Sequence, residues 1–194
     1  MKPLQEALDA VSEAADDGTL HSRPRIILAI DPGPSVCGVV LYDTAARLVL
    51  EKYKALPVAD TVRRLVSGRV PDVVVIERVQ SSGISGASLL RTSEVVGLLW
   101  GASRMTAPRA LVYRRRVCSE LHVHGAGKDR QVRERMIEMH GGSKGEAIGR
   151  KANPGPLYGV ASHAWQALGL AVAASSMLKR GALELSTAVE MPRG

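Results

Sequence analysis

The chain has 194 residues, of which 45% are hydrophobic, so it is long and apolar enough for one folded domain with a real core. Its two cysteines, Cys37 and Cys118, exclude a disulfide framework and a zinc site. The formal net charge is +7, and the longest apolar stretch, residues 164–174, is broken by Gln166 and too short to span a bilayer.

Residues 1–23 differ from the rest of the chain. Leu4, Leu8 and Val11 recur at helical spacing, and a polar stretch follows. This pattern predicts a short helix or a loose tail ahead of the main domain. The first residues lack the apolar segment of a signal peptide, so we expect a cytoplasmic protein that does not contact a membrane.

The first half of the main domain predicts strands and one helix. Apolar runs indicate strands over 25–31, 36–43 and 46–53, the last two joined as a hairpin. A helix over 58–68 then leads into a strand over 72–77. Three antiparallel strands, a helix and a fourth strand are the opening order of the ribonuclease H-like fold.

The second half alternates helices and loops with one further strand. We expect one α/β domain over 24–180, with a mixed sheet of three antiparallel and then parallel strands flanked by helices, and a C-terminal tail over 181–194. The elements expected are a loop over 81–88, a helix to about 105, a strand over 109–113, a helix over 129–140, a loop over 141–159 and a last helix over 160–179.

Two of the predicted core strands end in an acid. Asp31 follows the apolar run 26–30, and Glu77 follows the run 73–76. A charge at the end of a buried strand is costly unless it is paired or binds a cation. Each acid alone is better explained as the cap of a loop. Together they predict a pair of carboxylates at one end of the sheet, where a hard metal such as magnesium binds.

Basic residues concentrate in one quarter of the chain. Residues 104–151 hold twelve basic and five acidic residues, so this segment alone accounts for the net charge of the whole chain. Such a block is typical of a surface that binds a polyanion. The alternative is a solvated surface kept for solubility. A membrane surface is less favoured, because the segment lacks an aromatic-rich amphipathic helix.

The last predicted helix offers a third site residue. His163 and Gln166 are three positions apart, so they share one face of the helix. In a fold of this order the helix begins near the two acids, which brings His163 within reach of a metal held by Asp31 and Glu77. A purely structural role for this histidine is the alternative.

Five ordered segments between about Arg25 and Ala174 resemble the RuvC group of Holliday-junction resolvases, and its phage and prophage members most of all. An Asp-Pro-Gly strand also opens the actin-like and sugar-kinase ATPases, but those need two such domains, and the chain is too short for both. The segments are Ile30-Asp31-Pro32-Gly33 with Gly38, Ile76-Glu77-Arg78, Gly127–Arg133, Gly155–Gly159 and Ser162–Leu168.

The resemblance implies a homodimeric endonuclease, dependent on Mg²⁺ or Mn²⁺, that nicks branched DNA symmetrically. Carried over by position, its catalytic residues are Asp31, Glu77, His163 and Gln166, with the first three as metal ligands. Gln166 is a departure, because many RuvC proteins have a carboxylate there. An amide oxygen can bind magnesium but adds no charge for a second cation. Asp129 is a candidate for the missing acid, or else the N-cap of a helix that starts at Arg130.

The implied mechanism uses metal ions about 4 Å apart to activate water and stabilise the leaving 3′ oxygen. The basic block would then bind phosphates without reading bases, and selectivity would come from the shape of the junction. The residues expected to contact DNA are Arg114, Arg115, Arg116, Lys128, Arg130, Arg133, Lys144, Arg150 and Lys151.

Two further expectations remain open. Because Gln166 is neutral, the chain is alternatively a junction-binding module that does not cut. The predicted helix around 89–100 carries more leucine and valine than one sheet face needs, which predicts a dimer contact, although burial against the sheet explains the same pattern. The residues concerned are Leu90, Val95, Leu98 and Leu99.

Overall fold

The computed structural model describes residues 25–80, 86–104, 106–123 and 129–187. The predictions for residues 1–23, for the end of the C-terminal tail and for Lys128 therefore lie outside the described residues. Within these ranges no helix is long and apolar enough to cross a membrane.

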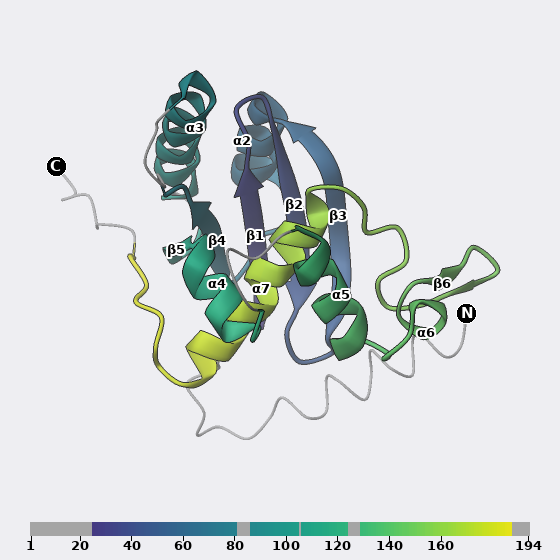
Figure 1. The fold of residues 1–194 in the computed structure, drawn as a ribbon. Helices are drawn as coiled ribbons and strands as arrows, with labels where there is room; N and C mark the ends of the chain where they lie inside the picture. Colours follow the sequence, from purple (N-terminus) through teal and green to yellow (C-terminus); the bar gives the residue numbers. More distant parts are fainter. Residues whose placement is uncertain (1–24, 81–85, 105, 124–128, 188–194) are drawn as a thin grey trace, which may run out of the picture.

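The core of the fold is a five-stranded sheet in the order β3-β2-β1-β4-β5 (Figure 1). The first three strands are antiparallel, and β4 and β5 run parallel to β1, which confirms the predicted mixed sheet. The strands are β1 Ile26–Pro32, β2 Val36–Asp43, β3 Leu48–Pro57, β4 Val73–Arg78 and β5 Arg109–Tyr113.

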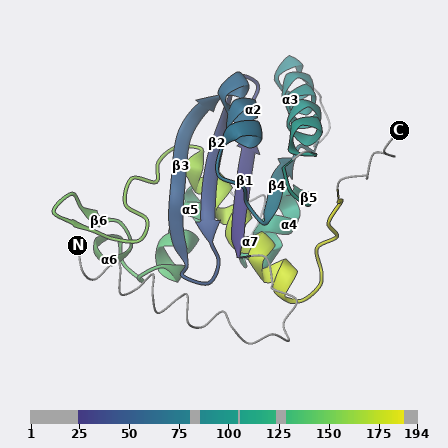
Figure 2. The ribbon, with the colours of Figure 1, turned by 180° about the vertical axis from the view of Figure 1, so that it is seen from behind.

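Helices cover both faces of the sheet, which gives three layers (Figures 1 and 2). One face carries α4, α5 and α7, and the other carries α2 and α3. Side chains of a strand alternate between the faces, so Ile27 and Ala29 of β1 join the α7 core while Leu28 and Ile30 join the α3 core. The helices are α2 Val58–Ser67, α3 Ala87–Ser103, α4 Arg114–Glu120, α5 Asp129–Met139 and α7 Ala164–Lys179.

Helix α7 is the central helix of the domain and is buried over most of its length. It begins at Ala164, four residues later than predicted. Ser162 has a φ of 48°, a left-handed conformation that an α-helix does not continue through. Small residues let neighbours approach closely: a Cβ at Gly169 would lie 2.6 Å from a methyl of Val132 in α5.

The segment 141–159, predicted as a loop, contains regular structure. A short helix, α6 Lys144–Ala147, is capped by Ser143, whose side chain accepts a hydrogen bond from the backbone N–H of Glu146. A two-stranded hairpin follows, β6 Gly149–Arg150 and β7 Asn153–Pro154. In both views this unit lies beyond the β3 edge of the sheet (Figures 1 and 2).

Candidate active site

Strand register brings the two predicted acids together. In the parallel pairing of β1 and β4, Ile30 lies opposite Ile76, so the next residues, Asp31 and Glu77, end neighbouring strands. Strand alternation points both carboxyl groups to the face covered by α7. The side chains are largely buried, with 16% exposure for Asp31 and 14% for Glu77.

Burial changes the acidity of both groups. Desolvation raises the pKa of Asp31 to about 7 against the positive charge of Arg114, and the charge of Asp129 adds to the rise. Desolvation likewise raises the pKa of Glu77 to about 7, with Arg114 opposing and the charge of Asp31 adding. The negative charge of Asp31 therefore repels that of Glu77, but burial is the larger cause of the raised pKa. Near neutral pH both groups are poised to lose a proton to a cation.

His163 lies next to the first acid. Its Nδ1 is 3.5 Å from Oδ2 of Asp31, as the sequence predicted for a residue at the start of the last helix. The approach depends on Gly38, which pairs with Asp31 in the sheet. A Cβ at Gly38 would lie 2.3 Å from the carbonyl oxygen of His163 and 2.8 Å from its Cβ. Any larger residue at position 38 would therefore push the start of α7 away from the sheet.

Gln166 is buried in the first turn of α7, three residues after His163. Its Nε2 lies 3.4 Å from the backbone carbonyl oxygen of Asp129 and donates to it, which ties α7 to the start of α5. Its Oε1 is buried and has no hydrogen-bond partner among the described residues. A buried carbonyl oxygen without a partner is rare in folded proteins and is an available ligand for a cation.

Arg114 occupies a position that the sequence did not predict. It was expected on the DNA-binding surface, but its Nη1 lies 3.2 Å from Oε2 of Glu77 and its Nη2 lies 3.0 Å from Oδ1 of Asp129. Asp129 stands inside the first turn of α5 rather than ahead of it as the predicted N-cap. We call Asp31, Glu77 and Asp129, with Arg114, the acid cluster.

The donors at this position fit a hard divalent cation. Asp31 and Glu77 offer buried carboxylate oxygens, Gln166 offers an unpartnered amide oxygen, and His163 offers an imidazole nitrogen. Within the described ranges, no three His, Cys, Asp or Glu side chains already stand close enough to hold a metal ion together. The expected ligands Asp31, Glu77 and His163 are therefore neighbours that must close around an ion, and not a preformed three-ligand cage.

Three adjoining hollows lead away from the acid cluster. The first, about 330 Å³, is lined by His163 and Gln166 together with Arg130 and Arg133. The second, about 240 Å³, shares both arginines and reaches Lys144. The third, about 420 Å³, runs from Lys144 to Arg150 and Asn153. We call the cationic side chains along these hollows the basic track: Arg130, Arg133, Lys144 and Arg150.

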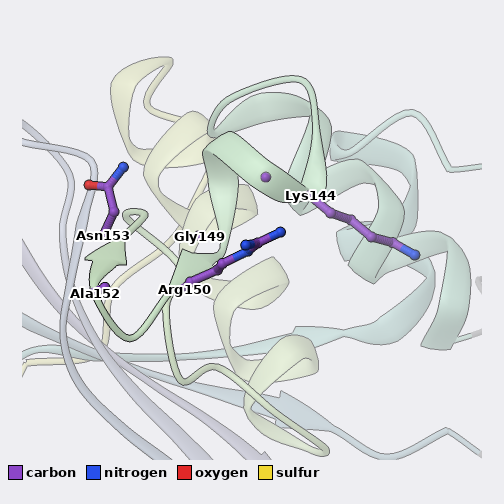
Figure 3. A pocket seen from close by; sticks show the side chains of 6 residues that line it. Lys144, Gly149, Arg150, Ala152 and Asn153 are labelled. Atoms are coloured by element: carbon purple, nitrogen blue, oxygen red, sulfur yellow. The ribbon is translucent and has the colours of Figure 1, made fainter.

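Figure 3 shows two residues of the basic track, Lys144 and Arg150, extended toward the same side of the third hollow. The remaining predicted DNA contacts lie off this track. Lys151 is exposed in the turn of the β6–β7 hairpin. Arg115 and Arg116 are exposed on α4 and line none of these three hollows, and Arg116 donates to the backbone carbonyl of Ala182. The sequence grouped nine basic residues, and the structure collects four of them along one path.

Comparison with solved structures identifies the fold, whereas comparison of sequences finds no match. Neither a family model nor a curated protein matches the sequence. Among solved structures, Thermus thermophilus RuvC is similar over 83% of this chain and 99% of its own, with a TM-score of 0.58 and 17% identity. The chain has the RuvC fold. Thermus thermophilus RuvC in complex with a Holliday junction substrate is similar over the same shares, with a TM-score of 0.61 and 16% identity. The RuvC fold is of the ribonuclease H-like class that the strand order predicted.

Proposed function

We propose that this protein is a structure-specific endonuclease that cuts four-way (Holliday) or other branched DNA junctions by metal-assisted hydrolysis of a phosphodiester bond. The observation that carries the proposal is the acid cluster at one end of the basic track. Acids alone describe many hydrolases, and a basic surface alone describes many DNA-binding proteins. Here the acid cluster and the basic track meet at the hollow lined by His163 and Gln166. This meeting supports a reaction on a polyanion that is bound along the track.

Different residues would bind the metal ion and position the phosphate. Asp31, Glu77 and His163 would hold Mg²⁺ or Mn²⁺, with Oε1 of Gln166 as a further oxygen donor. The chemistry supplied by such a cation, when bound, is activation of water and stabilisation of the leaving 3′ oxygen. Arg133, which also lies over the ring of Trp165 at 5.4 Å, and Arg130 would position the phosphate next to the cut.

Recognition of the substrate would rest on phosphates and shape. The basic track is made of side chains that bind phosphate oxygens, and the chain has no Phe, two Trp and four Tyr for stacking on bases. The similar RuvC structure that contains a Holliday junction substrate supports branched DNA as the ligand. The cut site would be selected mainly by the geometry of the junction.

A homodimer is part of the proposal, because two symmetric nicks need two sites related by a two-fold axis. Helix α3 offers the surface: Leu90 is 60% exposed and Leu98 is 53% exposed. Gly97 and Gly101 lie on the same side with open space around them, so a second copy can approach closely. The other two residues predicted at this contact, Val95 and Leu99, are buried against the sheet.

The dimer is tested by sedimentation at micromolar concentration. The double substitution Leu90→Glu and Leu98→Glu should convert a dimer into a monomer, because four added charges would meet across the two-fold axis. Val66→Glu is the matched control, since Val66 is an equally exposed apolar residue on α2. A wild-type chain that sediments as a monomer with and without DNA would contradict the dimer.

A second candidate is a junction-binding module that no longer cuts. Two observations favour it: Gln166 is neutral, and Arg114 already pairs with Glu77 and Asp129. Purified protein incubated with a labelled four-way junction and a matched linear duplex, in Mg²⁺, Mn²⁺ or chelator, separates the candidates. We expect junction cutting that needs the metal. Binding without cutting in either metal would support the module, and equal affinity for both DNAs would count against both.

A further inference from the structure

The guanidinium of Arg114 lies between two acidic side chains. It spans two acids from different elements, Glu77 at the end of β4 and Asp129 at the start of α5, at 3.2 and 3.0 Å. The arginine side chain is only 21% exposed and Glu77 is 14% exposed, so water screens the contact between them poorly. Asp129 is 81% exposed, so its contact with Arg114 is screened more strongly. Arg114 also lowers the pKa of both Asp31 and Glu77, so its charge reaches both buried acids.

Arg114 is held in place by its position in the fold. It follows Tyr113, the last residue of β5, and begins α4. Because β5 is parallel to β4 and pairs with it up to Arg78, the end of β5 lies at the same edge of the sheet as Glu77. The next two arginines of the run, Arg115 and Arg116, are exposed on α4. Only the first arginine of the three is directed into the site.

We propose that Arg114 is a resident cation that takes the place of a second metal ion, so that each chain binds one divalent cation. The inference rests on the proposed function, since it concerns the metal site of that endonuclease. Charge supports it: three carboxylates and one guanidinium leave two negative charges, which one divalent ion balances. Gln166 adds no charge, and neither does an imidazole that binds a metal ion. A second divalent ion would have to bind beside the guanidinium and would make the site positive.

The alternative for Arg114 is a latch that leaves the acids when metal binds. In that case the wild-type chain would accept two ions and the arginine would swing to solvent. The two models differ in the number of ions bound by the full-length wild-type protein, which is measurable without DNA and without catalysis.

Metal binding is counted by titrating the full chain with Mn²⁺ and following the electron paramagnetic resonance signal of the free ion. The titration is run above the pKa of about 7 that burial gives Asp31 and Glu77, so that the acids are ionised. We expect one Mn²⁺ per chain for the wild type and for Arg114→Lys, which keeps the charge. We expect two for Arg114→Ala and for Arg114→Gln, which remove it. Arg115→Ala, one residue along the same helix, should stay at one.

The outcomes separate this inference from the proposed function. Two Mn²⁺ bound by the wild type, with junction cutting intact, would overturn the resident cation and leave the endonuclease standing. One Mn²⁺ of unchanged affinity in both Arg114→Ala and Arg114→Gln would overturn it as well. No Mn²⁺ bound by the wild type would overturn both proposals. The wild-type count decides between the models even where a substitution prevents folding.

Discussion

The acid cluster and the basic track carry charge in opposite ways. Asp31 and Glu77 are fixed by strand ends and are buried, so each interacts strongly with its few neighbours and is poorly screened. The basic track lies on α5, α6 and a small hairpin, and its residues face solvent, where salt weakens each contact. The first region suits chemistry at one point, and the second suits reversible attachment along a strand of phosphates.

Because of this difference, substitutions in the two regions should affect cleavage and DNA affinity separately. A change in the acid cluster should remove cutting and leave DNA affinity, and a change in the basic track should weaken affinity and leave the chemical step. The substitutions below test that separation.

Asp31→Asn should have the largest effect. It removes a buried carboxylate at the position proposed for the metal, so cleavage should fall by about 10³-fold or more, as for loss of a main charge-stabilising group. Stabilisation of the fold by Mg²⁺ or Mn²⁺, seen as a rise in Tm, should vanish. Affinity for the junction should hold or rise, because one negative charge near phosphate is gone. Asp60→Asn, on α2 of the opposite face, is the control, and intact cutting in Asp31→Asn would place the site elsewhere.

Lys144→Ala combined with Arg150→Ala should mainly reduce affinity. Two lost phosphate contacts should weaken junction binding by roughly tenfold or more at low salt and flatten the log–log salt dependence by about 2. The single-turnover rate at saturating DNA should stay at the wild-type value. Arg63→Ala with Arg69→Ala removes the same charge from the other side of the domain and should change little. An unchanged salt slope in the Lys144 and Arg150 variant would show that DNA does not follow the basic track.

Gln166→Asp should raise cleavage in Mg²⁺, by roughly tenfold, because it adds a charged oxygen donor at the acid cluster. The gain is limited, since aspartate cannot donate the hydrogen bond that Gln166 gives to the carbonyl of Asp129. Gln166→Leu, with no donor oxygen, should lower metal affinity and serves as the comparison. If Gln166→Asp changes nothing, Gln166 does not act on the metal, and Asp31, Glu77 and His163 form the site alone.

The metal-free protein should lose stability as the pH rises. Asp31 and Glu77 hold their protons up to a pKa of about 7 in the folded state, whereas in the unfolded chain they ionise near pH 4. The folded state therefore binds more protons between these values, and the free energy of unfolding falls across that range and levels off above about pH 7. Thermal melts in chelator should show this slope, and Asp31→Asn should reduce it. Burial lowers the pKa of His140, which adds an opposite slope to both proteins, so the comparison between them is the test. Equal slopes for the wild type and Asp31→Asn in chelator would contradict the buried acid pair.

His163→Ala should have the smallest effect on metal binding. It removes a neutral ligand and leaves both carboxylates in place, so Mn²⁺ affinity should fall by less than in Asp31→Asn, on the order of tenfold. Calorimetric titration of both variants gives the ranking directly. His140→Ala is a poor control, because His140 is buried and hydrogen-bonded to Tyr42. His122→Ala is better suited, because His122 is exposed in the turn that follows α4. An affinity in His163→Ala equal to wild type would remove His163 from the ligand set.

Sequence patterns predicted the sheet and both acids because the signals were local. An apolar run that stops at Asp31 or Glu77 marks a strand end, and the order of strands and helices implies that the two ends share one edge. The position of His163 followed from the same topology. Each of these features needs only the period of a strand or helix and the order of elements.

The features that escaped prediction depend on three-dimensional orientation. Three successive arginines look equivalent in sequence, and only the direction in which α4 leaves β5 selects Arg114 for the acid cluster. The β6–β7 hairpin has two residues in each strand, too few for any periodicity. The capping pattern of Ser143 and Glu146 was a usable signal for α6 that the glycine-rich context obscured.

The pairing of β1 with β4 also determines which changes in chain length the site can accept. The connection between the two acids includes β2, β3 and α2, yet their separation is fixed by the pairing of Ile30 with Ile76 alone. Insertions and deletions in the turns of that connection should leave the carboxylates where they are. Deletion of one residue inside β4 is different, because it would turn Glu77 to the opposite face of the sheet, away from α7.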